Sequence, residues 1–428
     1  MQERLTELYQ GVAVHATADR EHVTAWFYDN ASVGERYVYP NTRVPAAKGM
    51  QLALDTPDDF VRIEAIMARL PGYPADADLA DVVRAAREAP ADPWRGRYGP
   101  LMIAEIGGNH EGDFDVARRM AADAIATGVD CVKFQLYRGD TLVSPVESPT
   151  RNAHFKKFEL TREQHVALAQ MCRDAGVAYL ASVWDLEMLE WIDEYQSYYK
   201  IGSGDLTAWP VVREFARRGK PIILSTGLST LDEVIETVAF IQSVDPRYRE
   251  PEFLCLLQCT SMYPIPDHEA NLRVMDALRA ATGLAVGYSD HTEGGMALRA
   301  ATAMGAQALE FHFTDSREGK VFRDHKVSLT PDEVRALQQD LAQICALRGT
   351  PVKTPQATEV EQQHPVSFRR AAYLSRDLPA GTVIAREHLV VLRPNHGVDA
   401  RDAESLIGRP LTRDVRAFES LADAVAEE

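Results

Sequence analysis

The sequence predicts an α/β protein built on a (β/α)8 (TIM) barrel, with a short N-terminal α/β appendage before the barrel and a small β-rich module after it. From residue 101 onward, short apolar segments alternate with amphipathic helical stretches. Eight such strand–helix pairs follow one another within about 250 residues, which is typical of a closed parallel barrel. A doubly wound open sheet is the structural alternative, but eight nearly even repeats favour closure.

Each predicted strand is short and apolar in its middle, and each precedes a stretch whose apolar residues recur at helical spacing. The strands are expected at 101–108, 130–137, 177–184, 198–204, 221–227, 253–261, 284–291 and 308–314. The helices are expected at 115–127, 161–175, 185–194, 209–219, 230–243, 269–281, 294–304 and 331–347. Residues 141–160 form an insertion on the face where such barrels carry their active sites, and the whole barrel domain is predicted to span 98–348.

Other segments flank the predicted barrel. Residues 349–366 hold three prolines and many polar residues, which predicts a linker. Residues 367–428 are expected to fold as a separate small module, with short strand-like runs and turn signals such as "DLPAGT". Residues 1–97 form the N-terminal appendage, in which Thr56 and the proline after it predict the start of a helix.

The composition excludes several classes of protein. The formal net charge of −17 argues against a nucleic-acid or membrane-surface partner. The five cysteines are scattered without a CxxC pair, which indicates reduced thiols rather than a disulfide framework. No run approaches the roughly 18 apolar residues of a membrane helix. The start "MQERLTELYQ" has no apolar signal region, so a cytoplasmic location is expected.

Polar and ionisable side chains gather toward the C-terminal ends of seven of the eight predicted strands. In a closed barrel these ends converge on one mouth, where catalytic residues lie. Taken singly, each has a structural explanation, since a strand-end serine often caps a helix. Together they predict a shared site, because isolated buried charges are costly. They are Glu105, Asn109, His110, Lys133, Gln135, Lys200, Ser203, Asp205, Ser225, Ser261, Tyr263, Ser289, His291, Glu310 and His312.

The residue types indicate the chemistry of this site. His291 and His312 end neighbouring strands, and two neutral imidazoles facing one pocket suit a first-row divalent metal with positions open to water and substrate. Lys133 and Lys200, with the strand-end serines, would form a cationic cradle for phosphate or carboxylate. Neither a G-x-G-x-x-G nor a P-loop pattern is present in the sequence, so a dinucleotide or nucleotide fold is not predicted.

Seven segments occur in a characteristic order: "IAEIGGNHEG", "VKFQ", "YKIGSGD", "ILSTG", "QCTSMYP", "YSDHT" and "LEFHFT". Together they resemble the sialic acid synthase family, which includes N-acetylneuraminate, legionaminic acid and pseudaminic acid synthases. The tail from "FRRAAYLS" through "LRPNHG" and onward is similar to the antifreeze-like (SAF) module that ends these synthases. The resemblance covers about residues 101–425.

The resemblance implies a reaction between phosphoenolpyruvate and an open-chain N-acetylated mannosamine-type sugar, with a nine-carbon 2-keto-3-deoxy acid and phosphate as products. It implies that His291 and His312 hold a divalent metal ion, Mn²⁺ before Mg²⁺ or Co²⁺, which polarises the sugar aldehyde. Glu105 or Glu310 would transfer protons in the reaction, and the resemblance does not separate the roles of the two carboxylates.

The family's binding positions carry over residue by residue. Those for phosphoenolpyruvate are matched by Lys133, Lys200, Ser203, Ser225, Ser261 and Ser289. Those on the sugar side are matched by Glu105, Gln135, Asp205, Tyr263 and Asp324. Arg393, in "LRPNHG", matches an arginine that the SAF module offers to the sugar's N-acyl group in the partner subunit, which implies a domain-swapped homodimer.

Some segments depart from the family's pattern at the sugar end. The chain has "SVWD" where many members have Thr-Pro-Phe-Asp, and "FRDH" where many have Gly-Pro-Asp-His. Asp205 replaces a common glutamate. These departures predict a modified or differently charged hexose in place of N-acetylmannosamine. Residues 1–97 resemble the C-terminal end of SpsF-like cytidylyltransferases but lack their nucleotide-binding half, so a packing or dimerisation role is expected there.

Two other functions compete with a synthase. A Schiff-base aldolase acting on a 2-keto acid would use Lys133 or Lys200 as its nucleophile. A carbohydrate-binding or ice-binding protein, suggested by the SAF-like tail, would have no catalytic activity. The pair of histidines argues against the aldolase, and the lysine-rich mouth argues against a binding protein.

Overall fold

The computed structural model describes residues 81–82 and 92–426. Contacts divide the chain into two compact units, Met1–Arg348 and Gly349–Glu428, which are described separately below. The helix predicted to start at Thr56 and most of the predicted appendage 1–97 lie outside the described residues.

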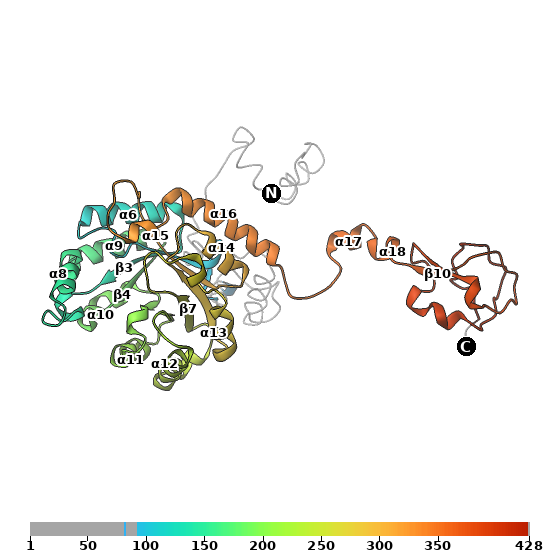
Figure 1. Cartoon of the computed structure of the whole chain (residues 1–428), viewed down its shortest axis with the longest axis horizontal. Helices are drawn as coiled ribbons and strands as arrows, with labels where there is room; N and C mark the ends of the chain where they lie inside the picture. Colours follow the sequence, from blue (N-terminus) through green and yellow to red (C-terminus); the bar gives the residue numbers. More distant parts are fainter. Residues whose placement is uncertain (1–80, 83–91, 427–428) are drawn as a thin grey trace. The chain divides into compact units, whose positions relative to one another are not determined.

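The first unit contains a closed barrel of parallel strands (Figure 1). Each strand from β2 to β9 pairs in parallel with the next, and β2 also pairs with β9, so the sheet has no open edge. The strands are β2 (Gly99–Glu105), β3 (Cys131–Leu136), β4 (Ala178–Val183), β5 (Tyr199–Ile201), β6 (Ile222–Ser225), β7 (Leu254–Cys259), β8 (Ala285–Asp290) and β9 (Ala308–His312). The short β1 (Arg95–Gly96) pairs antiparallel with β2. Closure confirms the predicted barrel and excludes the open doubly wound sheet.

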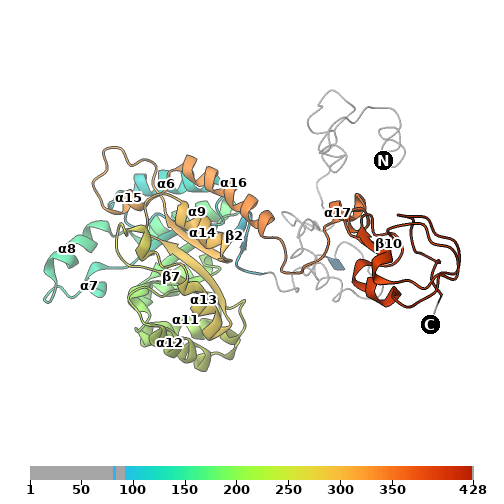
Figure 2. The ribbon, with the colours of Figure 1, turned by 45° about the vertical axis from the view of Figure 1, so that its right-hand side comes forward.

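A ring of helices surrounds these strands (Figures 1 and 2). They are α6 (Phe114–Thr127), α9 (Arg162–Asp174), α10 (Leu186–Ile192), α11 (Trp209–Arg218), α12 (Leu231–Val244), α13 (Val274–Thr282), α14 (Met296–Ala303) and α16 (Pro331–Arg348), with the short α15 (Asp324–Val327) before α16. Short 3-10 turns are η3 (Asp193–Tyr195), η4 (Ser203–Asp205), η5 (Pro246–Arg249) and η6 (Asp267–Glu269). Capping boxes at Thr161 and Thr230 start α9 and α12 where the sequence predicts them. Among the described residues, no helix is long and apolar enough to span a bilayer.

The alternation of side chains along the strands explains both the core and the position of the site. Outward residues such as Val132 and Phe311 pack with the helices in one large apolar cluster. Inward residues near the N-terminal ends, such as Ile103 and Leu180, form a second apolar cluster inside the barrel. Because this inner cluster fills the lower part of the barrel, the polar inward positions that follow it open toward the C-terminal mouth.

The predicted insertion forms two short helices, α7 (Gly139–Leu142) and α8 (Pro149–Phe158), which lie together at one side of the barrel (Figure 2). The buried amide of Asn152 joins them, since its Nδ2 donates to the carbonyls of Gly139, at 3.0 Å, and Val143, at 2.8 Å. The insertion is therefore tied into the fold by internal hydrogen bonds.

The second unit has its own small core. β10 (Ala371–Leu374) and β11 (Leu389–Leu392) pair antiparallel, and the turns η7 (Arg386–His388) and η8 (Ala400–Leu406) lie in the same unit. Its buried apolar side chains form a cluster of their own, as an independent module requires. The segment predicted as a linker contains α17 (Ala357–Glu361) and α18 (His364–Ser367) at its end. The run "TVIA" is not a strand, and Val383 makes an isolated bridge to Pro410.

A buried histidine between α9 and the barrel predicts acid sensitivity of this fold. The Nδ1 atom of His165 lies 2.9 Å from the hydroxyl of Tyr179, and burial lowers the pKa of His165 to about 3. The unfolded chain takes up this proton near pH 6.5, so the contribution is fully present above that pH and is lost as pH falls toward 3. Between pH 7 and 4.5 the free energy of unfolding should fall by about 3 kcal/mol through this group.

Urea unfolding followed by circular dichroism at several pH values would measure this loss. His165→Gln keeps a partner for Tyr179 but cannot be protonated in this range, so its stability should fall less steeply. Parallel curves for the two proteins would contradict the prediction.

Candidate active site

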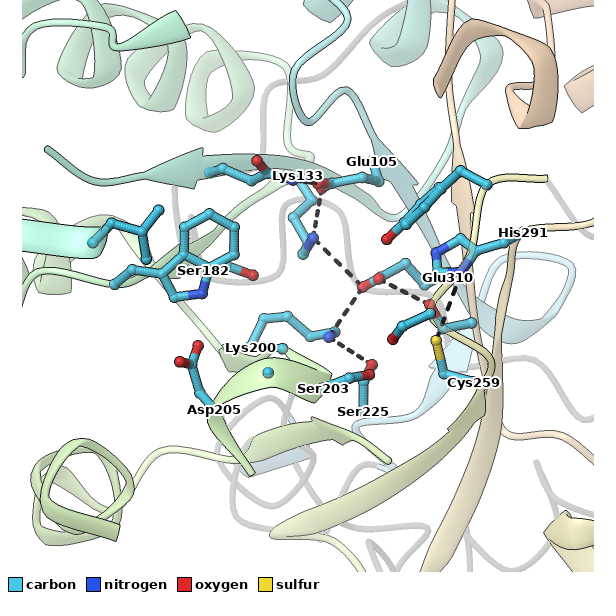
Figure 3. A pocket seen from close by; sticks show the side chains of 18 of the residues that line it. Glu105, Lys133, Ser182, Lys200, Ser203, Asp205, Ser225, Cys259, His291 and Glu310 are labelled. Atoms are coloured by element: carbon cyan, nitrogen blue, oxygen red, sulfur yellow. Dashed lines mark hydrogen bonds and ion pairs between the residues drawn. The ribbon is translucent and has the colours of Figure 1, made fainter. Parts of the chain in front are cut away.

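A pocket of about 500 Å³ opens at the C-terminal ends of the barrel strands (Figure 3). The structure brings most of the predicted site residues to its walls, one or more from nearly every strand. They are Glu105, Lys133, Gln135, Lys200, Ser203, Asp205, Ser225, Ser261, Tyr263, Ser289, His291, Glu310 and His312. Asp324 and Arg393 are not among the residues that line it.

Two buried lysines share one carboxylate at the floor of the pocket (Figure 3). The Oε2 atom of Glu310 lies 3.8 Å from the Nζ of Lys133 and 3.7 Å from the Nζ of Lys200. Lys133 also forms a 2.6 Å ion pair with Glu105, and Lys200 donates to the hydroxyl of Ser225 at 2.7 Å. Glu310 Oε2 has no hydrogen-bond partner among the described residues, so the two ammonium groups are not held tightly by it.

The same network sets the pKa values of these groups. Burial lowers the pKa of Lys200, and Glu310 offsets this only in part. For Lys133 the nearby Glu105 and Glu310 outweigh burial and raise the pKa. Burial would raise the pKa of Glu310, but the two lysines keep it below its ordinary value, whereas burial raises the pKa of Glu105. One carboxylate is therefore held ionised while the other is pushed toward protonation.

Backbone and hydroxyl groups complete this cationic floor. The backbone N–H of Gly227, just after β6, donates to the hydroxyl of Ser203 at 3.0 Å. A Cβ at position 227 would lie 2.6 Å from the Oγ of Ser261, so the glycine is required for the close approach of these serines. Lysine ammonium groups surrounded by hydroxyls form a suitable site for a phosphate or carboxylate.

His291 and His312 stand at the other side of the pocket, with ring centroids 5.3 Å apart. The Nδ1 of His291 lies 2.7 Å from the carbonyl oxygen of Thr260, which can only accept, so this nitrogen carries the proton and Nε2 keeps a lone pair. Burial lowers the pKa of His291, and burial together with His291 holds the pKa of His312 well below its ordinary value. Both rings are neutral at pH 7, as metal binding requires.

The described residues fit a metal site with two protein ligands. The Nδ1 of His312 is buried without a hydrogen-bond partner in the described part of the chain and lies 3.9 Å from the carboxylate of Asp324, so the ring is not committed to a hydrogen bond and is available as a ligand. No group of three or more His, Cys, Asp or Glu that could hold a metal is found among residues 81–82 and 92–426. Two imidazoles would leave further coordination positions to water and substrate.

Two of the predicted site residues lie elsewhere. The carboxylate of Asp324 stands 3.9 Å from the Nδ1 of His312 and 3.3 Å from the Nε of Arg323, so it lies beside the histidine but is not one of the residues of the pocket wall. Arg393 belongs to the second unit, where its guanidinium lies 5.5 Å from the ring centroid of Phe368. Among the other strand-end residues, Asn109 donates to the carbonyl of Phe313 and has a structural role.

The pocket also contains residues that the sequence analysis did not select. Ser182 on β4 pairs in register with Gln135 and Lys200, so strict alternation along the strand could have identified it. Cys259 ends β7, and its thiol lies 3.9 Å from the Nδ1 of His291. Gly202 and Gly204 follow β5, and further members come from the insertion and from the loop after β4, where no periodicity marks them. They are Leu142, Val143, Ser144, Arg151, Phe155 and Trp184.

Comparison with known proteins gives this site a family. Residues 120–353 match the NeuB family, and residues 369–424 match the SAF domain. The chain belongs to the NeuB family. NeuB-family proteins are metal-dependent synthases that condense phosphoenolpyruvate, so this chain is an enzyme, and the family implies phosphoenolpyruvate and an amino sugar as its substrates.

Individual relatives agree with this assignment. The chain is 34% identical over 338 residues to the N,N'-diacetyllegionaminic acid synthase of Legionella pneumophila, which covers 75% of this chain and 93% of that protein. It is 31% identical over 309 residues to the N-acetylneuraminate-9-phosphate synthase of Mus musculus, covering 69% and 84%. Its structure is similar to N-acetylneuraminic acid (sialic acid) synthetase from Leptospira borgpetersenii, with a TM-score of 0.57, 27% identity, and coverage of 62% and 90%.

Membership of the NeuB family settles the alternatives that the sequence left open. The predicted synthase family and its C-terminal SAF domain are confirmed. The Schiff-base aldolase and the non-catalytic binding protein are wrong, because the family condenses phosphoenolpyruvate. Neither family match reaches residues 1–97, so the resemblance of that segment to cytidylyltransferases stays a prediction.

Proposed function

We propose that this enzyme condenses phosphoenolpyruvate with an open-chain N-acetylated mannosamine-type sugar to give a nine-carbon 2-keto-3-deoxy acid and phosphate. The observation that carries the proposal is the pair of buried lysines around Glu310, beside two neutral histidines in one pocket. The phosphate and carboxylate of phosphoenolpyruvate need positively charged groups around them. The aldehyde of the sugar needs a group beside it that withdraws electrons from its oxygen.

The reaction divides between the two sides of the pocket. Carbon 3 of phosphoenolpyruvate bonds to the aldehyde carbon, whose oxygen becomes a hydroxyl after gaining a proton. Water then adds at carbon 2, the water loses its protons, and the carbon–oxygen bond to phosphate breaks. Lys133, Lys200 and the serines around Gly227 hold the phosphate and carboxylate through these steps.

The histidines and carboxylates have distinct parts in this proposal. His291 and His312 would hold a divalent ion, with Mn²⁺ as our first choice, which when bound acts as a Lewis acid on the aldehyde. Glu105, which accepts from both Lys133 and Gln135, is placed to exchange a proton with the reacting groups. Glu310 keeps its charge between the lysines, while the closer contacts to Glu105 and Ser225 position the two ammonium groups.

The identity of the sugar is the finer part of the proposal. The guanidinium of Arg323, in the unusual "FRDH" segment, lies 4.7 Å from the ring centroid of Tyr263, and Asp205 replaces a common glutamate. These residues support a modified or differently charged hexose. We also propose a domain-swapped homodimer in which Arg393 of each SAF domain meets the sugar in the partner's barrel, as the family resemblance implies.

A phosphate-release assay tests this function. Phosphoenolpyruvate is combined with N-acetylated hexosamines and diacetamido hexoses, with and without Mn²⁺, and the new acid is identified by mass spectrometry. We expect release of one phosphate per acid formed, and loss of activity after chelation. Phosphate release without formation of the acid, or equal activity in EDTA, would contradict the proposal.

A further inference from the structure

We propose that Arg151, on α8, determines acceptor specificity by binding an anionic group, a phosphate or a carboxylate, at the end of the sugar remote from the aldehyde. This inference rests on the proposed function and names the class of acceptor that the site selects. Its basis is a wall of the pocket formed by Arg151, Phe155 and Trp184.

The wall stands at the side of the pocket away from the metal-binding histidines. Figure 3 shows Asp205 and Ser182 on one side of the two lysines and His291 on the other. Trp184 comes two residues after Ser182 and lines the same pocket as Asp205. A sugar whose aldehyde lies at the histidines, with phosphoenolpyruvate on the lysines, therefore directs its far end toward this wall.

The wall is held in place by its own contacts. The rings of Tyr137 and Trp184 lie 5.3 Å apart, and Tyr137 meets Phe155 edge-on at 5.3 Å. Asn152, next to Arg151, is 4% exposed and ties α8 to α7 through two backbone carbonyls. The base of α7 is fixed in turn, because Thr141 donates to the carboxylate of Asp185 at 2.9 Å. Arg151 therefore lies at the pocket on a helix that is held in place by hydrogen bonds and ring contacts.

Arg151 has no acidic partner within ion-pair distance among the described residues, and its recorded contact is the ring of Phe155 at 5.9 Å. Other cations are nearby, since the positive charges of Arg323, Lys157 and Arg151 all act on His154 of the same helix. In a chain of net charge −17, an unpaired guanidinium with cationic neighbours at a pocket wall favours an anionic ligand.

The test compares acceptors that differ in one charge. Phosphate release from saturating phosphoenolpyruvate with Mn²⁺ is measured for a neutral N-acylhexosamine, its 6-phosphate and its 6-carboxylate. For the natural enzyme we expect kcat/KM at least about tenfold higher with one of the two anionic acceptors, and which of the two it is identifies the group. Arg151→Met should raise KM for that acceptor by about 10- to 100-fold, the usual worth of a charged hydrogen bond.

Matched variants distinguish a binding role of Arg151 from an effect of net charge and from a loss of folding. KM for the neutral acceptor and for phosphoenolpyruvate should not change in Arg151→Met, and Arg151→Lys should restore part of the loss. Arg213→Met removes the same charge from an exposed residue of α11 that does not line the pocket, and should leave all KM values within about twofold. A preference of the natural enzyme for the neutral acceptor, or an equal effect of Arg151→Met on all acceptors, would overturn the role of Arg151. Failure of every acceptor to release phosphate would instead overturn the proposed function, and the role of Arg151 with it.

Discussion

Replacing His312 with alanine is expected to lower kcat on the order of 10³-fold, because Lewis-acid activation of a carbonyl supplies several kcal/mol to the transition state. The ring is buried, neutral and close to His291, and its Nδ1 makes no hydrogen bond among the described residues. The variant should also lose affinity for Mn²⁺, measured by calorimetry or by the metal dependence of the rate. Binding of phosphoenolpyruvate should change much less, because its cradle lies on the lysine side of the pocket.

The control for this variant is a histidine outside the pocket. His268, in the turn η6, is exposed, and His268→Ala should leave kcat and the response to Mn²⁺ unchanged. Thermal unfolding of His312→Ala should stay close to that of the natural protein, since removal of a neutral ring leaves no buried charge unpaired. Full metal-dependent activity of His312→Ala would show that the ion is held elsewhere.

The barrel and the inward-facing residues of its site could be predicted because both follow from the two-residue alternation of side chains along the strands. Alternation along β9 places Leu309 and Phe311 against the helices and Glu310 and His312 inside, and the register of β9 with β2 brings Glu105 beside His312. Eight strand–helix repeats then fix closure. Such patterns are local in sequence. Because the parallel strands of a closed barrel end at the same mouth, the residues at their C-terminal ends come close together without any other contact being known.

The rest of the site depends on contacts that no period encodes. Arg151 and Phe155 reach the pocket because Asn152 bonds to the carbonyl of Gly139 in α7 and to that of Val143 just after it, an arrangement set by tertiary packing. Asp324 follows a loop after β9, and only the fold shows that it stands behind His312. The start of α13 was expected five residues early, because η6 and its neighbouring residues hold polar side chains in a turn before the helix begins at Val274.

The second large effect is expected at the floor of the pocket. Lys200→Met should lower kcat/KM for phosphoenolpyruvate on the order of 10³-fold, since it removes a buried ammonium group that meets Glu310 and Ser225. Ser225→Ala removes only the hydroxyl and should cost about tenfold. Initial rates at varied phosphoenolpyruvate, with the acceptor sugar saturating, separate the effect on KM from the effect on kcat.

Stability distinguishes the catalytic role of Lys200 from its structural one. Without Lys200, the buried Glu310 carboxylate keeps only one nearby ammonium group, that of Lys133. The free energy of unfolding of Lys200→Met should therefore fall by roughly 3 kcal/mol. Adding Glu310→Gln removes the poorly compensated charge, and the double variant should recover most of this stability while staying inactive. If the double variant instead regained activity along with stability, Lys200 would serve to neutralise Glu310 rather than to bind phosphoenolpyruvate. An inactive double variant with restored thermal stability, beside a Glu310→Gln single variant that keeps activity, assigns the ammonium group of Lys200 directly to the substrate.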